Sequence, residues 1–287
     1  LPVIRASLFI EHTTDTDSAI RSLKYGGMTG NSIINRQIAS ADLFWNRTLA
    51  GSDAAEGFLE WFPGKTVRDV SRRGKFILIS IPPKTLLIHL RMSGDLKVTD
   101  GSGAESGKHD RFRLAFTDGG RLVFSDPRKF GRIWLTAAPE TVLGSLGIEP
   151  LDDGFTPEWL YDKLHTSNRM IKSVLLDQRV IAGLGNIYSD EALFSAGIHP
   201  ARAACSLSTE EVARLVQAIQ TVLRDGIQYN GASIDWVYRG GSFQHHFKIY
   251  GRTGEPCLIC GTKIEKTTIN QRGTHFCPCC QPRAEKN

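Results

Sequence analysis

The segment CLICGTKIEKTTINQRGTHFCPCC, residues 257–280, holds five of the six cysteines of this 287-residue chain. It contains two C-x2-C pairs, 16 residues apart, formed by Cys257, Cys260, Cys277 and Cys280. Each C-x2-C turn presents two thiolates to one ion, and a gap of this length holds a hairpin, so the spacing predicts a tetrahedral zinc site. Cys279 is an alternative fourth ligand, since it forms a C-x-C with Cys277. A disulfide pair or unbound thiols are the competing interpretations, but a secreted disulfide framework spreads its cysteines through the chain.

The sequence between the two cysteine pairs resembles two short strands joined by a turn of Asn270, Gln271, Arg272 and Gly273. Zinc would make this hairpin rigid, so the guanidinium of Arg272 would be held at its tip with little conformational entropy left to lose. Arginine suits bidentate contact with phosphate. A solvated turn arginine without a partner is the alternative.

Composition and charge narrow the class of protein. Apolar residues make up 41% and charged residues 23%, which is ordinary for a folded protein and excludes a disordered or fibrous chain. No segment approaches the roughly 18 apolar residues of a membrane-spanning helix, and LPVIRASLFI is a poor signal peptide because Glu11 and His12 follow it at once. The net charge of +5 is compatible with a polyanionic partner, although four thiolates and one zinc ion would lower it to +3.

The order of patterns along the chain predicts an α+β multidomain protein. Short β-rich runs separated by turn signals predict strands at 75–81, 85–92, 111–117 and 121–126, and the segments 17–25 and 41–49 are short helices or loops. After Pro150 the pattern becomes helical, at 156–165, 169–178, 189–198 and 206–227. The expected boundaries are a β-rich domain at 1–149, a helical domain at 150–245 and a zinc hairpin at 246–287.

Two predicted loops of the β-rich domain carry large side chains beside turn residues. They are HLRMSG (89–94), with Met92, and SDPRKFGRI (125–133), with Arg128 and Phe130. A thioether, a guanidinium and a phenyl ring on exposed loops suit insertion into a base stack and filling of the hole left by an extruded base. Taken singly, Met92 and Phe130 would more ordinarily be core residues.

A third motif, VIAGLGNIYSDEALF (180–194), resembles a nucleotide-binding fingerprint only weakly, because no strand clearly precedes it and no third glycine follows. A tight turn between helices is the better interpretation. It would place backbone N–H groups and the amide of Asn186 at a helix N-terminus, where anions bind.

Together, HLRMSG, SDPRKFGR, VIAGLGNIYSDEALF, FQHHFKIYGRTGEPC and the terminal QRGTHFCPCCQ resemble the bacterial formamidopyrimidine-DNA glycosylase family, a relative of endonuclease VIII. The resemblance runs from about Gly64 to Arg283. It implies an N-terminal β-sandwich with flanking helices, a helix-two-turn-helix domain and a C-terminal zinc finger hairpin. It also implies duplex DNA with a damaged base as the partner, and one structural zinc ion.

The resemblance implies a base-excision repair glycosylase with AP-lyase activity that removes oxidised purines, 8-oxoguanine and formamidopyrimidines. Its phosphate-gripping residues would be Lys75, His89, Asn186 and Arg272. Its void-filling residues would be Met92, Arg128 and Phe130. The catalytic residues would be Pro2 and Lys75. We expect a monomer that does not bind membranes, in a bacterial-type cytoplasm and associated with the nucleoid.

The beginning of the sequence departs from the family pattern. Members of the family start with Pro-Glu, whereas here Pro2 is followed by Val3. An N-terminal amine is a usable nucleophile because its pKa is about 8, below that of lysine. Three interpretations stay open: Leu1 is removed and Pro2 acts with a carboxylate such as Glu11; the N-terminus is atypical and the chain is a catalytically impaired binding protein for lesions and abasic sites; or the given start is not the native one.

Overall fold

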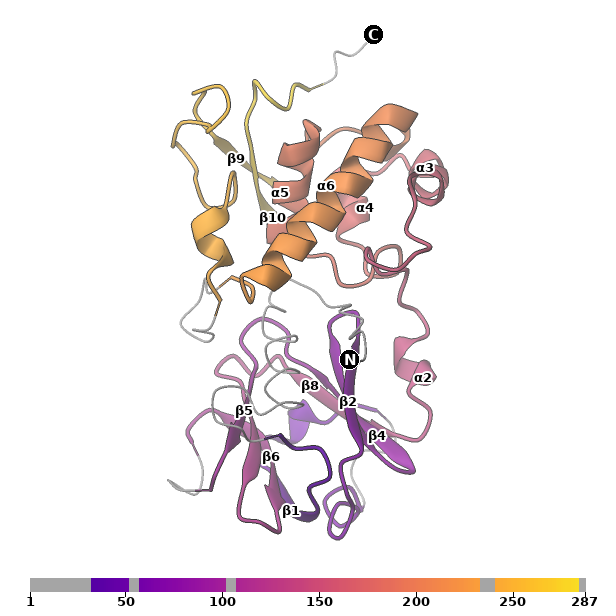
Figure 1. Ribbon diagram of the computed structural model, residues 1–287, viewed down its shortest axis with the longest axis vertical. Helices are drawn as coiled ribbons and strands as arrows, with labels where there is room; N and C mark the ends of the chain where they lie inside the picture. The colour runs from indigo at the N-terminus through magenta and orange to yellow at the C-terminus, as the bar shows by residue number, and fades with distance from the viewer. Residues whose placement is uncertain (1–31, 52–56, 102–106, 233–240, 284–287) are drawn as a thin grey trace, which may run out of the picture. The chain divides into compact units, whose positions relative to one another are not determined.

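The computed structural model describes residues 32–51, 57–101, 107–232 and 241–283 (Figure 1). Pro2, Glu11 and the segment 17–25 lie outside the described residues. The chain forms two compact units. We call the described residues up to Gly144 the N-terminal unit, and residues 145–232 and 241–283 the C-terminal unit.

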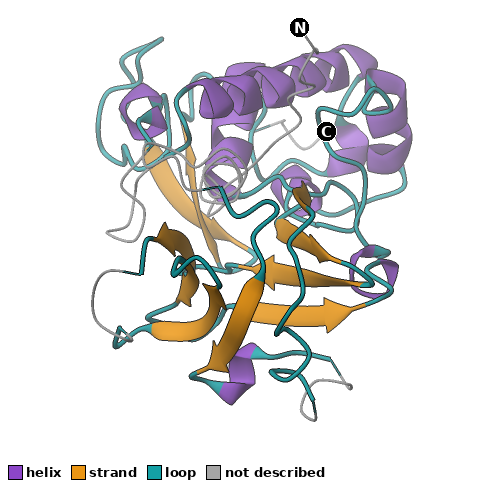
Figure 2. Ribbon diagram, turned by 60° about the horizontal axis from the view of Figure 1, so that its bottom comes forward, coloured by secondary structure: helices purple, strands orange, loops and turns teal. Residues whose placement is uncertain are grey.

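The N-terminal unit contains two four-stranded antiparallel sheets, drawn as orange arrows in Figure 2. One sheet has the order β1 (Ile38–Leu43), β6 (Asp110–Phe116), β7 (Arg121–Ser125), β5 (Asp95–Thr99). The other has the order β2 (Asp69–Arg73), β3 (Phe76–Ile81), β4 (Lys84–His89), β8 (Arg132–Thr136). Alternate residues of β3 and β6, such as Ile77 and Leu114, are fully buried in one hydrophobic core. The expected β-sandwich is therefore confirmed.

The segment 41–49 is neither a short helix nor a loop throughout. Its first three residues end β1, which pairs with β6, and Asn46–Thr48 form a 3-10 turn (η2). Pairing with a strand about 70 residues away therefore decides its conformation, which local pattern does not reveal. The only other described helix of this unit is the short α2 (Glu140–Leu143).

The C-terminal unit contains α3 (Pro157–His165), α4 (Ile171–Leu175), α5 (Asn186–Ala196) and α6 (Thr209–Gln228), with 3-10 turns η3 (Ala204–Ser206) and η4 (Phe243–His246). Thr156 caps α3, and Ser208 and Glu211 form a capping box on α6. Helix α5 is buried along almost its whole length, so it is the centre of the helical core. No helix within the described ranges has the length and apolar character needed to cross a membrane.

The zinc hairpin belongs to the same compact unit as these helices. Its strands are β9 (Glu265–Ile269) and β10 (Arg272–Phe276), and β10 packs beside α5 (Figure 1). The boundaries expected at 149/150 and 245/246 remain predictions.

Candidate functional site

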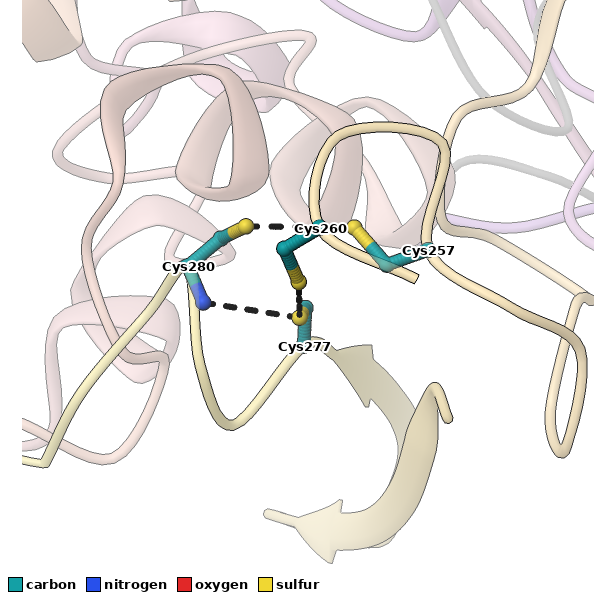
Figure 3. Close-up of side chains that lie close together, drawn as sticks. All are labelled: Cys257, Cys260, Cys277 and Cys280. Atoms are coloured by element: carbon teal, nitrogen blue, oxygen red, sulfur yellow. Dashed lines mark hydrogen bonds between the residues drawn. The ribbon is translucent and has the colours of Figure 1, made fainter. Parts of the chain in front are cut away.

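The four cysteines of the two C-x2-C pairs form one cluster in the C-terminal unit (Figure 3). Their sulfur atoms all lie within 4.8 Å of one another, with Sγ–Sγ distances of 3.8 Å for Cys257–Cys280 and 3.5 Å for Cys260–Cys277. A tetrahedral zinc ion with bonds of about 2.3 Å to sulfur requires sulfur atoms about 3.8 Å apart, so the cluster fits the ion. Cys279 is exposed and outside the cluster, which favours Cys280 as the fourth ligand.

The surroundings shift the pKa values of these thiols in opposite directions. Burial raises the pKa of Cys277 and Cys280, whereas hydrogen bonds with Thr262 lower the pKa of Cys260 to about 6. Four thiolates this close would repel one another, and a divalent ion offsets that repulsion. The backbone N–H groups of Ile259 and Cys280 each donate to a cysteine sulfur, at 3.4 Å.

Arg272 stands beside a tight turn that fixes its position. The turn residues Asn270 and Gln271 both have positive φ, 48° and 61°, as in two-residue hairpin turns, and Arg272 opens β10 opposite Ile269. The turn is therefore one step earlier than the sequence indicated. The Arg272 side chain is exposed, as contact with a ligand requires.

A buried polar cluster fastens this hairpin to the helices. Nζ of Lys172, which is fully buried on α4, donates to the carbonyl of Gly273 at 3.0 Å and to Oγ1 of Thr274 at 2.9 Å. The same ammonium lies 2.6 Å from Oδ1 of Asp190 on α5, and the other carboxylate oxygen accepts from the backbone N–H of His275 at 2.9 Å. These links join α4, α5 and β10 at a site that the sequence analysis missed.

Asn186 contacts the hairpin at the same residue as Lys172, Gly273. Its Nδ2 donates to the carbonyl of Gly273 at 3.0 Å, and its Oδ1 is buried without a hydrogen-bond partner among the described residues. Gly273 directly follows Arg272. The structure therefore brings together two of the four predicted phosphate-gripping residues, on one hydrogen-bonded support.

The other two predicted phosphate-gripping residues, Lys75 and His89, belong to the N-terminal unit. Lys75 precedes β3, and His89, at the end of β4, pairs with Phe76 across the sheet. Burial, and next the charges of Arg91 and Lys75, lower the pKa of His89 to about 3, so its imidazole is neutral near pH 7. The N–H of Arg91 donates to Nδ1 of His89 at 3.0 Å, which places the imidazole proton on Nε2 as a donor.

The loops that contain Met92, Arg128 and Phe130 lie at the ends of β4 and β7 in this unit. Phe130 is 48% exposed, an unusual position for a large apolar residue, and the guanidinium carbon of Arg128 lies 5.2 Å from the centroid of its ring. Arg128 is exposed and Met92 is half-buried. The core alternative is therefore wrong for Phe130.

Known proteins match the chain along most of its length. Residues 27–133 match the family model of the formamidopyrimidine-DNA glycosylase N-terminal domain, residues 146–237 the H2TH domain of the same glycosylases, and residues 254–283 a zinc finger found in FPG and IleRS. Curated formamidopyrimidine-DNA glycosylases from Bacillus cereus (41% identity over 261 residues, 88% of this chain and 94% of theirs) and Shouchella clausii (43% over 257 residues, 87% and 93%) are similar to it.

Among solved structures, the Lactococcus lactis Fpg in complex with DNA containing an abasic site is similar at 33% identity and a TM-score of 0.85. The match covers 94% of this chain and 99% of that one. A complex of the same Lactococcus protein with DNA containing Fapy-dG matches equally well.

Proposed function

The chain belongs to the formamidopyrimidine-DNA glycosylase family, and from this premise we propose that it removes oxidised purines, 8-oxoguanine and formamidopyrimidines, from duplex DNA and then cuts the strand as an AP lyase. Identity of 41–43% over more than four-fifths of the chain carries the proposal. The rigid zinc hairpin and the exposed Arg128–Phe130 loop support it, since they suit binding to a damaged duplex.

The proposed phosphate grip consists of two pairs of donors, one on each unit. Lys75 supplies a positive charge and His89 a neutral N–H, while Arg272 supplies a guanidinium and Asn186 an amide. Contacts of this kind hold and orient the DNA backbone without reading its sequence. The proposed wedge consists of Met92, Arg128 and Phe130, with Arg128 facing the base that loses its partner, cytosine.

The chemical step needs an amine that attacks C1′ of the damaged nucleotide, displaces the base and forms a Schiff base, from which β,δ-elimination cuts the strand. We propose that Leu1 is removed, so that the secondary amine of Pro2 is freed and acts as this nucleophile, and that Lys75 is a catalytic residue beside the reacting nucleotide. Because misplacement by about 1 Å costs about a hundredfold in rate, the position of the amine is decisive.

Borohydride trapping tests this function. The full chain is mixed with a duplex carrying 8-oxoguanine opposite cytosine, reduced, and the cross-linked peptide is mapped. We expect excision of the base and a covalent adduct, and mapping shows whether Pro2 carries it. No excision and no adduct, together with tight and salt-sensitive binding to an abasic analogue, would instead identify a catalytically impaired binding protein.

Replacing Arg272 by alanine tests the phosphate grip. We expect the affinity for a lesion duplex to fall at least tenfold, since a charge-assisted hydrogen bond contributes about 1.5–3 kcal/mol. The slope of log K against log salt should shrink by about one, the share of one phosphate contact. Lys263→Ala removes an exposed charge from the same zinc hairpin and should leave the slope unchanged. An unchanged slope in Arg272→Ala excludes Arg272 from the grip.

We also propose that one copy of the chain acts alone on DNA in a bacterial-type cytoplasm, associated with the nucleoid. One chain supplies both pairs of phosphate donors and the wedge, and the curated relatives come from bacteria.

A further inference from the structure

The side chain of Asp126 lies between the two loops of the proposed wedge. It follows β7, is completely buried, and accepts three hydrogen bonds through its carboxylate. Its Oδ1 accepts from the Ser93 hydroxyl at 2.5 Å and from the Arg128 N–H at 3.2 Å, and its Oδ2 accepts from the Gly131 N–H at 2.6 Å. The Arg128 N–H is also 3.3 Å from Oγ of Ser93. One carboxylate therefore fastens both loops.

These bonds act directly on the residues that carry the wedge. Ser93 is the neighbour of Met92, while the Arg128 and Gly131 N–H groups enclose the three-residue tip that ends in Phe130. Nε of the buried Arg111 donates to the backbone carbonyl of Asp126 at 2.8 Å, which fixes the base of the loop. Because backbone groups are held, the bonds determine the path of the loop rather than one rotamer.

Both loops pack against the same apolar side chain, that of Phe124. A Cβ added to Gly131 would overlap the ring of Phe124, and one added to Gly94 would lie 2.8 Å from the same ring. Phe124 is fully buried in the core of the sandwich. The loops are thus packed against one side chain as well as bonded to one carboxylate.

Lys129, the middle residue of the tip 128–130, has a contact of its own outside the tip. Lys129 has a φ of 62°, and its Nζ lies 4.0 Å from the centroid of Trp45, so this residue turns away from its neighbours. Arg128 and Phe130 remain together and exposed. A loop held in one conformation loses little entropy when it inserts between bases.

We propose that Asp126 is the positioning residue of the wedge: through Ser93 and the Arg128 and Gly131 N–H groups, it holds Met92, Arg128 and Phe130 in the conformation that fills the void left by an extruded base. The inference rests on the proposed function. Nothing in the sequence singles out Asp126, since an aspartate before proline ordinarily indicates a turn.

Asp126→Asn tests the proposal, because it keeps the shape but replaces one acceptor oxygen by an NH2 group that cannot accept. We expect affinity for a duplex with a tetrahydrofuran abasic analogue opposite cytosine to fall about 10- to 100-fold, the range for losing hydrogen bonds to a charged group. Affinity for undamaged duplex should stay unchanged, since the phosphate donors are untouched. The signal of a 2-aminopurine placed beside the analogue, which reports unstacking, should fall as well.

Two further variants make the series specific. Ser93→Ala removes one link and should give a smaller loss than Asp126→Asn. Asp42→Asn, which removes a partly exposed carboxylate paired with Arg113 in the same unit, should leave both affinities and the 2-aminopurine signal as in the unchanged chain.

Hydrogen exchange of the DNA-free protein separates this inference from the proposed function. The Arg128 and Gly131 amides should exchange at least tenfold faster in Asp126→Asn, while amides of β3 and β6 keep their rates. Unchanged exchange at both amides overturns the proposal whatever the DNA results are. Equal losses of affinity for abasic and undamaged duplex also overturn it, because they would show a general structural role. Failure of the unchanged chain to excise 8-oxoguanine would contradict the proposed function alone.

Discussion

Removal of zinc is expected to unfold the zinc module, residues 257–280, and to reduce affinity for a lesion duplex by more than 100-fold. The module contributes only Ile264 and two of its cysteines, Cys257 and Cys277, to its apolar cluster, which Phe194 and Ile249 complete from outside the module. So small a core cannot offset the entropy of ordering the segment, and structural zinc contributes about 10–16 kcal/mol in zinc-finger peptides. Arg272 would then lose its fixed position.

Chelation combined with zinc quantification and hydrogen exchange measures this effect. Cys280→Ser should lose the ion and the binding, whereas Cys279→Ser should keep both, because Cys279 is exposed and outside the cluster. Exchange should rise in β9 and β10 but not in α6. Tight binding to the lesion duplex by protein shown to be free of zinc would mean that the hairpin is not part of the site.

The cysteine pattern and the helix caps were predictable because each depends on residues close together in sequence. The strands that sequence analysis missed or misassigned are β1, β2, β5 and β8, and all four are edge strands. An edge strand has one neighbouring strand and tolerates charged or polar residues, so the alternation of apolar and polar residues along it is weak. In β2, for example, Val70 alone is buried.

The polar residues that position the candidate site were less predictable for a different reason. Lys172 and Asp126 sit in motifs that were noticed, but a charged residue in isolation indicates exposure. The Thr274 partner of Lys172 lies 102 residues away, and Ser93 lies 33 residues from Asp126. Only the folded chain brings such partners together. The residues implied by family resemblance were found without this information, because their motifs are local.

Replacing Lys172 by methionine is expected to destabilise the C-terminal unit by about 3–5 kcal/mol, the cost of breaking a buried ion pair from one side. Asp190 would remain buried, with its Oδ1 deprived of the ammonium at 2.6 Å. The carbonyl of Gly273 would keep only the Asn186 amide. The hairpin should therefore loosen next to Arg272, and affinity for the lesion duplex should fall along with the free energy of unfolding.

Denaturant unfolding measures the expected loss of stability, and binding titrations of the same variants measure the expected loss of affinity. Arg179→Gln, which removes the exposed partner of an ion pair with Asp177, should change the free energy of unfolding by about 1 kcal/mol or less. The double variant Lys172→Met with Asp190→Asn should recover much of the stability, because no unpaired charge stays buried, but not the affinity, because the ammonium that held Gly273 and Thr274 is still missing. Recovery of both the stability and the affinity would show that Lys172 serves stability alone. Recovery of neither would show that the lost hydrogen bonds, rather than the unpaired carboxylate, dominate the loss of stability.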